Sequence, residues 1–294
     1  MAPPAGHHSP PPAAEVLHVA FGSHYVVVRS VAPDLMAELR DALGAMVVEE
    51  PLGTCAGHVG ALPEAGEVRI VGAPDAGATQ RVSRQWAPRE LYHAVVKLLM
   101  LARDDLIWTH AGVAALGERA FMFCGPSGQG KSTLVAALLA RGWTYFSDEI
   151  AAIEASSGAV HPFPLAPRRR VHDGDFVPLD DGDAIRTLRK EAVDFPAHAV
   201  GARPLPLERI YFLHYAHAAG SIDVVPCPPA QSVLTLLRNS LSITADRERE
   251  IARLAQFASR VPAVQIRYHD AAAAAAHVHA DVALHLAVSP TSGA

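Results

Sequence analysis

The stretch that most constrains this chain is the octapeptide GPSGQGKS at residues 125–132, followed directly by Thr133. It fits the pattern G-x-x-x-x-G-K-[ST], whose glycines let consecutive backbone N–H groups turn toward a phosphate without a Cβ in the way. The pattern predicts a phosphate-binding loop. The residues expected to bind the nucleotide are Gly125, Ser127, Gly128, Gln129, Gly130, Lys131, Ser132 and Thr133.

Two side chains of this motif have distinct expected roles. Lys131 supplies a positive charge for the β- and γ-phosphates, and the Ser132 hydroxyl can ligate Mg²⁺. A helix that begins here adds the positive end of its dipole to the same anion site. ATP and Mg²⁺ are therefore the expected cofactors.

The residues on either side of the motif support this interpretation. Residues 120–124 (AFMFC) are an apolar run typical of a strand, and residues 134–139 (LVAALL) are apolar all round, which is typical of a buried helix. Strand, loop and helix thus follow in the order that a phosphate-binding loop requires. The alternative, a glycine-rich turn that binds nothing, does not explain this order.

Composition limits the function classes. Half of the 294 residues are hydrophobic and 19% are charged, so the chain can bury a sizeable core. A net charge of −5 argues against a general nucleic-acid-binding protein. The cysteines, which are Cys55, Cys124 and Cys227, form no C-x-x-C motif, so we expect neither a disulfide framework nor a zinc site. With no secretory signal and no apolar run long enough for a bilayer, we expect a cytoplasmic protein without a membrane partner.

The chain is predicted to have three parts. Residues 1–14, rich in Pro, Ala, His and Gly, form a disordered tail. Residues 15–87 form a small α/β accessory region whose role the sequence does not indicate. Residues 88–294 form an α/β nucleotide-binding domain with a mixed sheet, beginning with a helix at 88–103.

Local patterns predict individual elements on both sides of that boundary. The accessory region should contain a hairpin at 16–21 and 25–29, a helix at 33–43 and a strand at 67–71. Two strands, at 106–110 and 111–116, precede the strand of the loop. Beyond residue 200 we expect strands at 209–215, 222–226 and 264–268, and helices at 231–241, 246–260 and 271–288.

A pair of carboxylates follows the loop helix. Asp148 and Glu149 come directly after a predicted strand at 143–147. The helix carries the chain about 15 Å away from the phosphates at about 1.5 Å per residue, and the strand brings it back about 16 Å at about 3.3 Å per residue. Both carboxylates are therefore expected level with the phosphates, where they can bind Mg²⁺ or accept a proton from an acceptor hydroxyl. A solvated acidic turn is the alternative.

A hairpin is predicted after the carboxylates. Residues 150–154 and 159–163 flank the turn sequence SSG at 156–158. Small-metabolite kinases of the shikimate or gluconate type also place an Asp soon after the loop helix, but a helix normally follows it. The hairpin favours a different kind of kinase.

These features together resemble the HPr kinase/phosphorylases and their smaller relatives, whose nucleotide domain is similar to that of phosphoenolpyruvate carboxykinase. The resemblance covers residues 106–164 and rests on His110, the loop at 125–132, and Arg141-Gly142 followed by Asp148-Glu149. The fold implied is that of the HPr kinase C-terminal domain, with a mixed sheet.

The resemblance also implies roles for particular residues. Asp148 would be the catalytic base, assisted by Lys131 and by His110 close to the phosphates. Glu149, which stands where a second Asp is usual, would assist Ser132 in holding Mg²⁺. Taken alone, His110 is equally well explained as a hydrogen-bonded core histidine.

One family signature is absent from this sequence. Bifunctional members carry a string close to E-x-R-G-L-G that serves dephosphorylation, and no such string occurs here. The pattern is closer to the shorter HPr-kinase-related proteins, some of which serve peptide-modification clusters.

Two charged stretches and one helix face leave their roles open. Arg168, Arg169 and Arg170 form either a solvated loop or a contact to the γ-phosphate or an acidic acceptor. An acidic loop follows, and His277, Asp281 and His285 recur on one helix face, where a polar surface is a simpler interpretation than a metal site. The acidic residues of the loop are Asp173, Asp175, Asp180, Asp181 and Asp183.

The sequence therefore predicts a kinase that transfers the γ-phosphoryl group of Mg·ATP to a hydroxyl, with a serine of a protein or peptide as acceptor. Two alternatives stay open: a metabolite kinase with a small-molecule acceptor, and a non-catalytic, nucleotide-dependent interaction module. The acceptor itself is not identified. A homo-oligomer also stays open, because the family is often hexameric.

Overall fold

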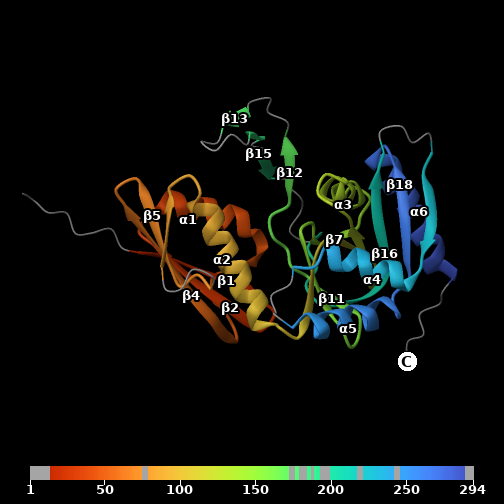
Figure 1. The fold of residues 1–294 in the computed structure, drawn as a ribbon, viewed down its shortest axis with the longest axis horizontal. Helices are drawn as coiled ribbons and strands as arrows, with labels where there is room; N and C mark the ends of the chain where they lie inside the picture. The colour runs from red at the N-terminus through yellow and green to blue at the C-terminus, as the bar shows by residue number, and fades with distance from the viewer. Residues whose placement is uncertain are drawn as a thin grey trace, which may run out of the picture. The chain divides into compact units, whose positions relative to one another are not determined.

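The computed structural model describes residues 14–74, 79–171, 176–178, 184–186, 189–192, 199–216, 221–241 and 246–288 (Figure 1). The chain divides into two compact units, Met1–Ala102 and Arg103–Ala294, and each unit is built on its own large sheet. Both sheets mix parallel and antiparallel pairs, so this is a mixed α/β protein. None of the described helices is both long and apolar enough to cross a membrane.

The N-terminal unit is a sheet of order β3-β1-β2-β4-β5-β6 with two helices packed on it. Among the described strands of this sheet, β2 and β4 pair in parallel, and the other neighbouring strands pair antiparallel. The apolar stripes of α1 and α2 are buried against the sheet. The elements are β1 (Glu15–Phe21), β2 (His24–Ser30), α1 (Pro33–Leu43), the short 3₁₀ helix η1 (Gly44–Met46), β3 (Val47–Val48), β4 (Thr54–Glu64), β5 (Glu67–Val71), β6 (Thr79–Ser83) and α2 (Ala87–Ala102).

The predicted domain boundary at residue 88 differs from the structure. Helix α2 packs on α1 and on strands β2 and β4, so it belongs to the N-terminal unit and the division falls after Ala102. Its apolar face, with Leu91, Val95 and Leu99 fully buried, could be read from the sequence, but not which sheet it covers. The long strand β4 was not predicted, because glycines at 57 and 60 and Pro63 interrupt its apolar pattern.

The C-terminal unit contains a sheet of order β11-β10-β7-β8-β16-β18-β17, in which β9 also pairs with β7. Strands β8, β16 and β18 run in parallel, so their carboxyl ends meet at one edge. Strand β11 additionally pairs with β16. The strands are β7 (Leu106–Leu116), β8 (Arg119–Cys124), β9 (Thr144–Ser147), β10 (Ile150–Glu154), β11 (Ala159–His161), β16 (Leu205–Tyr215), β17 (Asp223–Cys227) and β18 (Ala263–Tyr268).

Strand β7 is a single strand, whereas two strands were predicted at 106–110 and 111–116. It changes partners halfway along. On one edge residues 106–110 pair with β10 and Val113–Ala115 pair with β9, while on the other edge Ala111–Leu116 pair with β8. Gly112 lies at the change, which is the point where the sequence pattern was interrupted.

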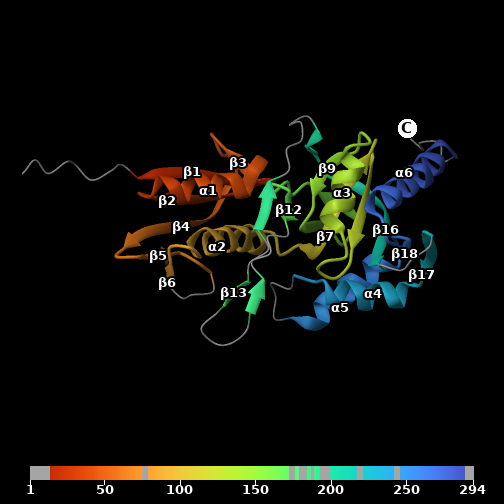
Figure 2. The same ribbon diagram turned by 90° about the horizontal axis from the view of Figure 1, so that it is seen from above.

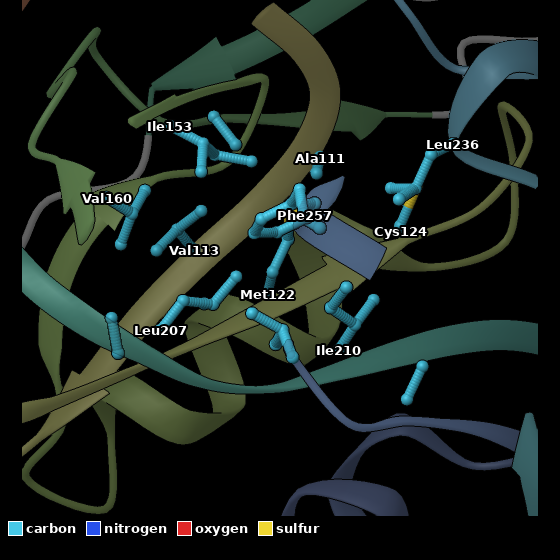
Figure 3. Packing of buried hydrophobic residues seen from close by; sticks show 14 of the residues in the cluster. Ala111, Val113, Met122, Cys124, Ile153, Val160, Leu207, Ile210, Leu236 and Phe257 are labelled. Atoms are coloured by element: carbon cyan, nitrogen blue, oxygen red, sulfur yellow. The ribbon is translucent and has the colours of Figure 1, made fainter. Parts of the chain in front are cut away.

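Four helices cover the two faces of this sheet. Helices α3 (Lys131–Leu139) and α6 (Ala271–Val288) lie on one face, and α4 (Pro229–Arg238) and α5 (Arg247–Ala258) lie on the other (Figure 2). The α4/α5 face is one apolar cluster to which β7 and β8 contribute Ala111, Val113 and Met122 (Figure 3). Because side chains alternate along β7, His110, Gly112 and Ala114 point to the α3 face.

The predicted hairpin after Glu149 is confirmed. Strand β10 turns back into β11, with Ala152 opposite His161 and Ile153 opposite Val160. The predicted strands and helices beyond residue 200 are also present within a few residues of the expected bounds. At the start of α6 the Asp270 carboxylate accepts a hydrogen bond of 2.6 Å from the backbone N–H of Ala273, the expected N-cap.

The polar face of α6 contacts charged side chains of β16. Asp281 accepts a hydrogen bond of 2.5 Å from Arg209, and His285 Nε2 lies 2.9 Å from Glu208. Within the described ranges, no group of three or more His, Cys, Asp or Glu side chains could hold a metal ion. Asp281 and His285 thus contact side chains of β16.

Two small two-stranded ladders lie between β11 and β16 in the chain: β12 (Arg168–Val171) with β15 (Arg189–Ala192), and β13 (Phe176–Pro178) with β14 (Ala184–Arg186). The hypothesis that Arg168, Arg169 and Arg170 contact a phosphate concerns side chains outside the described part of the structure. The acidic loop lies outside it as well, as do residues 1–13 of the predicted tail. The acidic residues concerned are Asp173, Asp175, Asp180, Asp181 and Asp183.

Candidate active site

The glycine-rich loop joins the carboxyl end of β8 to the start of α3, in the strand, loop and helix order expected from the sequence. Gly128 has φ of +85° and Gly130 of +78°, conformations that L-amino acids with a side chain rarely adopt. Gly130 is also the N-cap residue of α3. The helix therefore begins directly at the loop, and its first N–H groups and dipole are suited to binding an anion.

The side chain of Lys131 is held inside the loop. Its residue is only 7% exposed, and Nζ donates hydrogen bonds to the backbone oxygens of Gly125 at 2.7 Å and Pro126 at 3.1 Å. These carbonyls compensate the buried ammonium group. A phosphate in the loop would offer charged oxygens that compete for the same donors.

The loop is anchored on its other side by the ends of β16 and β18. Tyr268 Oη donates to the backbone oxygen of Gln129 at 2.6 Å, and the Gln129 side chain accepts a hydrogen bond of 2.5 Å from the backbone N–H of Tyr215. A Cβ on Gly130 would lie 2.7 Å from Tyr268 Oη, so glycine is required there on packing grounds as well. Burial raises the pKa of Tyr268 to about 12, which keeps its phenol protonated at neutral pH.

The carboxylate pair lies at the same edge of the sheet. Asp148 and Glu149 connect β9 to β10, where the backbone N–H of Ala111 donates to the Glu149 oxygen at 3.2 Å. On its other edge Ala111 is paired with Cys124, the residue just before the loop. Since neighbouring strands lie about 4.8 Å apart, the backbones of Glu149 and of the loop's first residues are separated by about 10 Å.

Asp148 lies on the α3 face of the sheet and is buried. It is 7% exposed, and its Cα lies 3.8 Å from the position that a Cβ on Gly112 would occupy. Tyr145 Oη lies 3.0 Å from Asp148 Oδ1 and 2.8 Å from the Leu165 backbone oxygen. This burial contradicts the interpretation of Asp148 as part of a solvated acidic turn.

Ser147 fixes the turn that presents the two carboxylates. Its hydroxyl oxygen accepts hydrogen bonds from the backbone N–H groups of Glu149 at 3.2 Å and Ile150 at 2.9 Å. Glu149 itself is half-buried. The side-chain oxygen thus replaces the ladder partner that the backbone lacks where β9 ends and β10 begins.

His110 is attached to this turn. Its Nδ1 donates a hydrogen bond of 2.9 Å to the Glu149 backbone oxygen, so in the neutral ring Nε2 carries no proton. Its backbone N–H donates to the Asn239 oxygen at 2.7 Å. Cys124 on β8 is paired with Ala111 on β7, and the two strands are antiparallel. His110, the residue before Ala111, is therefore level with Gly125, the first residue of the loop. The histidine is thus hydrogen-bonded, and it also lies beside both the loop and the acidic turn.

Cys124, directly before the loop, is buried, and its thiolate form is disfavoured. Burial raises the pKa of its thiol to about 12, outweighing the opposite effect of the nearby Lys131 charge. The site thus brings the glycine-rich loop with its buried lysine, the buried Asp148, the half-buried Glu149 and His110 to one edge of the sheet.

The tyrosines beside this site were not predicted from the sequence. Tyr145, Tyr215 and Tyr268 all contact it, but Tyr215 and Tyr268 contact Gln129 across 86 and 139 residues. No local pattern signals such a pair. The residues next to each tyrosine in the chain do not indicate its contact with the loop.

Comparisons with known proteins add little to this geometry. No protein-family model matches the chain, and no curated protein sequence matches it. Among solved structures, the Hpr(Ser) kinase/phosphatase from Coxiella burnetii matches with 14% identity and a TM-score of 0.34, covering 60% of this chain and 89% of that one. A likeness of this extent carries no argument about function.

Proposed function

We propose that this protein is an ATP-dependent kinase of the HPr-kinase-like type, which transfers the γ-phosphoryl group of ATP to a hydroxyl. One observation carries the proposal. A glycine-rich loop with its lysine and a buried carboxyl group, Asp148, lie on the same face and at the same edge of one sheet. Phosphoryl transfer requires these parts, because its catalysis consists mainly of positioning and charge stabilisation.

The residues have separate tasks in the proposed reaction. Backbone N–H groups of Gly128, Gly130 and Lys131 cradle the phosphates, and Lys131 leaves its carbonyl partners to stabilise charge that develops on the transferred group. Asp148 accepts the proton of the acceptor hydroxyl, whose oxygen attacks the γ-phosphorus as the bond to the leaving ADP breaks. His110 holds the acidic turn through its bond to the Glu149 backbone oxygen.

The donors present fit a magnesium ion bound together with the nucleotide. Mg²⁺ prefers oxygen ligands and is usually held by one or two carboxylates together with substrate phosphates, so no all-protein metal cluster is needed. Ser132, at the second position of α3, and Glu149 are the residues that would hold it. When bound, the ion neutralises charge on the β- and γ-phosphates.

The proposed acceptor is a serine of a protein or peptide. The hairpin β10–β11 after Glu149 supports this over a metabolite kinase of the shikimate or gluconate type, in which a helix follows the acidic residue. The second candidate function is a non-catalytic, nucleotide-dependent interaction module. One observation favours it: Lys131 donates its hydrogen bonds to the backbone oxygens of the loop. A protein that binds a nucleotide without catalysis does not need to release this lysine.

The proposal is tested by incubating the protein with γ-labelled ATP, Mg²⁺ and the proteins encoded by neighbouring genes. We expect a single acceptor to be labelled, on a serine. Lys131→Ala should abolish the labelling, because it removes the positive charge that stabilises the transferred group in the transition state. The variant must first be shown to fold by circular dichroism. Near-wild-type transfer by a folded Lys131→Ala variant would rule out the mechanism, and ATP binding without turnover would favour the interaction module.

A further inference from the structure

Two aromatic side chains border the glycine-rich loop on the side away from Asp148. Strand β16 pairs in parallel with β8 on one edge, with Phe212 opposite Cys124, and with β18 on the other, with Tyr215 opposite Tyr268. Both strands therefore continue past the level of Cys124, and their last residues lie beside the loop. On the face that carries α3, Tyr215 packs against the cluster containing Tyr268.

The contacts fix both tyrosines to the loop itself. Through Gln129, the loop joins the backbone of Tyr215 at 2.5 Å and the hydroxyl of Tyr268 at 2.6 Å. The two rings meet edge to face, with centroids 5.8 Å apart and an interplanar angle of 80°. Tyr268 is fully buried, whereas Tyr215 is half-buried, so only Tyr215 keeps surface at the rim of the site.

The order of the groups along this edge of the sheet indicates how a bound nucleotide is oriented. In strand order, the acidic turn after β9 lies beside β7, the loop follows β8, and Tyr215 and Tyr268 follow β16 and β18. If the terminal phosphate points to Asp148, as in the proposed function, the nucleoside extends the other way, toward β16. The first aromatic ring it meets there is Tyr215.

We propose that Tyr215 is the platform on which the base of the bound nucleotide stacks. The proposal rests on the proposed nucleotide-binding function and deepens it by assigning the base subsite. Every base presents a π-face, so stacking on a tyrosine ring contributes to affinity without selecting one base. The edge-to-face contact with Tyr268 holds the Tyr215 ring in place, and the backbone bond to Gln129 keeps it level with the phosphates.

The test compares MgATP with inorganic triphosphate, which has the phosphates but no base, by calorimetric titration of the full chain. We expect Tyr215→Ala to weaken MgATP binding about tenfold to a hundredfold, as loss of one stacked base does, with triphosphate binding unchanged. Tyr215→Phe keeps the ring and should bind MgATP like the wild type. GTP should lose affinity with Tyr215→Ala as ATP does.

His214→Ala is the matched control. His214 is the exposed neighbour of Tyr215 on β16 and points to the opposite face, so its loss should change neither affinity. Equal weakening of MgATP and triphosphate by Tyr215→Ala, or no weakening of either, would overturn the base subsite. A wild-type protein that binds triphosphate as tightly as MgATP would overturn it too, but would leave the phosphate site standing. A wild type that binds neither would overturn the proposed function itself.

Discussion

At the scale of single residues, Asp148 differs from an ordinary surface carboxylate. Its carboxyl group is buried, and one oxygen lies 3.0 Å from Tyr145 Oη, whose single proton also faces the Leu165 backbone oxygen. Burying an ionisable group costs free energy, so a carboxyl group kept in such a place beside the glycine-rich loop is a candidate for proton transfer.

Asp148→Asn should separate binding from chemistry. The amide has nearly the same shape as the carboxyl group but cannot accept the acceptor's proton, so kcat should fall about 10²- to 10⁴-fold while Kd for MgATP stays close to that of the wild type. Single-turnover kinetics and calorimetry measure the two effects. Glu149→Gln is the comparison. It should weaken Mg²⁺ binding, so that a higher Mg²⁺ concentration is needed, more than it slows the chemical step. Equal loss of binding and turnover in Asp148→Asn would reassign Asp148 to nucleotide binding.

At the scale of elements, local patterns predicted what local interactions determine. Helix α1, strand β5 and the hairpin β10–β11 were found because their periodicity and turn residues lie within a few positions of each other. Strand β7 was read as two strands, since Gly112 interrupts its pattern. The glycine is there for a tertiary reason: a Cβ at that position would lie 2.8 Å from Val135 Cγ2 of α3, so α3 can approach the sheet only over a glycine.

Gly112→Ala tests this close approach. The added methyl group overlaps a stiff β-branched side chain, so we expect a loss of about 1–3 kcal/mol in the free energy of unfolding, as is typical of an overfilled core. Because α3 carries the loop, MgATP binding should weaken as well. Val135→Ala removes the methyl groups that the new side chain would overlap. In the Val135→Ala background, Gly112→Ala should therefore cost much less stability and much less MgATP affinity than it does in the wild type. Denaturant unfolding and calorimetry check these outcomes, and full additivity of the two substitutions would show that the contact is not the cause.

At the scale of the whole molecule, the lengths of one helix and one strand predicted that the acidic pair returns to the edge of the sheet where the loop lies. The division between the units was predicted at residue 88 and lies after Ala102. The loop and the pair are linked by one short helix and one strand, so their relation depends on about 20 residues whose lengths follow from standard helix and strand geometry. The division at Ala102 depends on which sheet buries α2, and the tyrosine contacts depend on residues far apart in the chain. Such choices are made by tertiary packing, which local periodicity does not encode.

The separation into two units predicts where a nucleotide stabilises the chain. A ligand that binds only the folded state adds about 2.7 kcal/mol of stability at about 100 times its Kd, and it does so in the cooperative unit that contains the site. Hydrogen exchange with and without MgATP should therefore show added protection in the unit Arg103–Ala294, strongest in α3, β9 and the ends of β16 and β18, and little change in β1, β2 and α1. Lys131→Ala, measured at the same MgATP concentration, should show no added protection in either unit. Protection spread equally over both units would mean that the N-terminal unit takes part in nucleotide binding, and the site would then have to include residues of that unit.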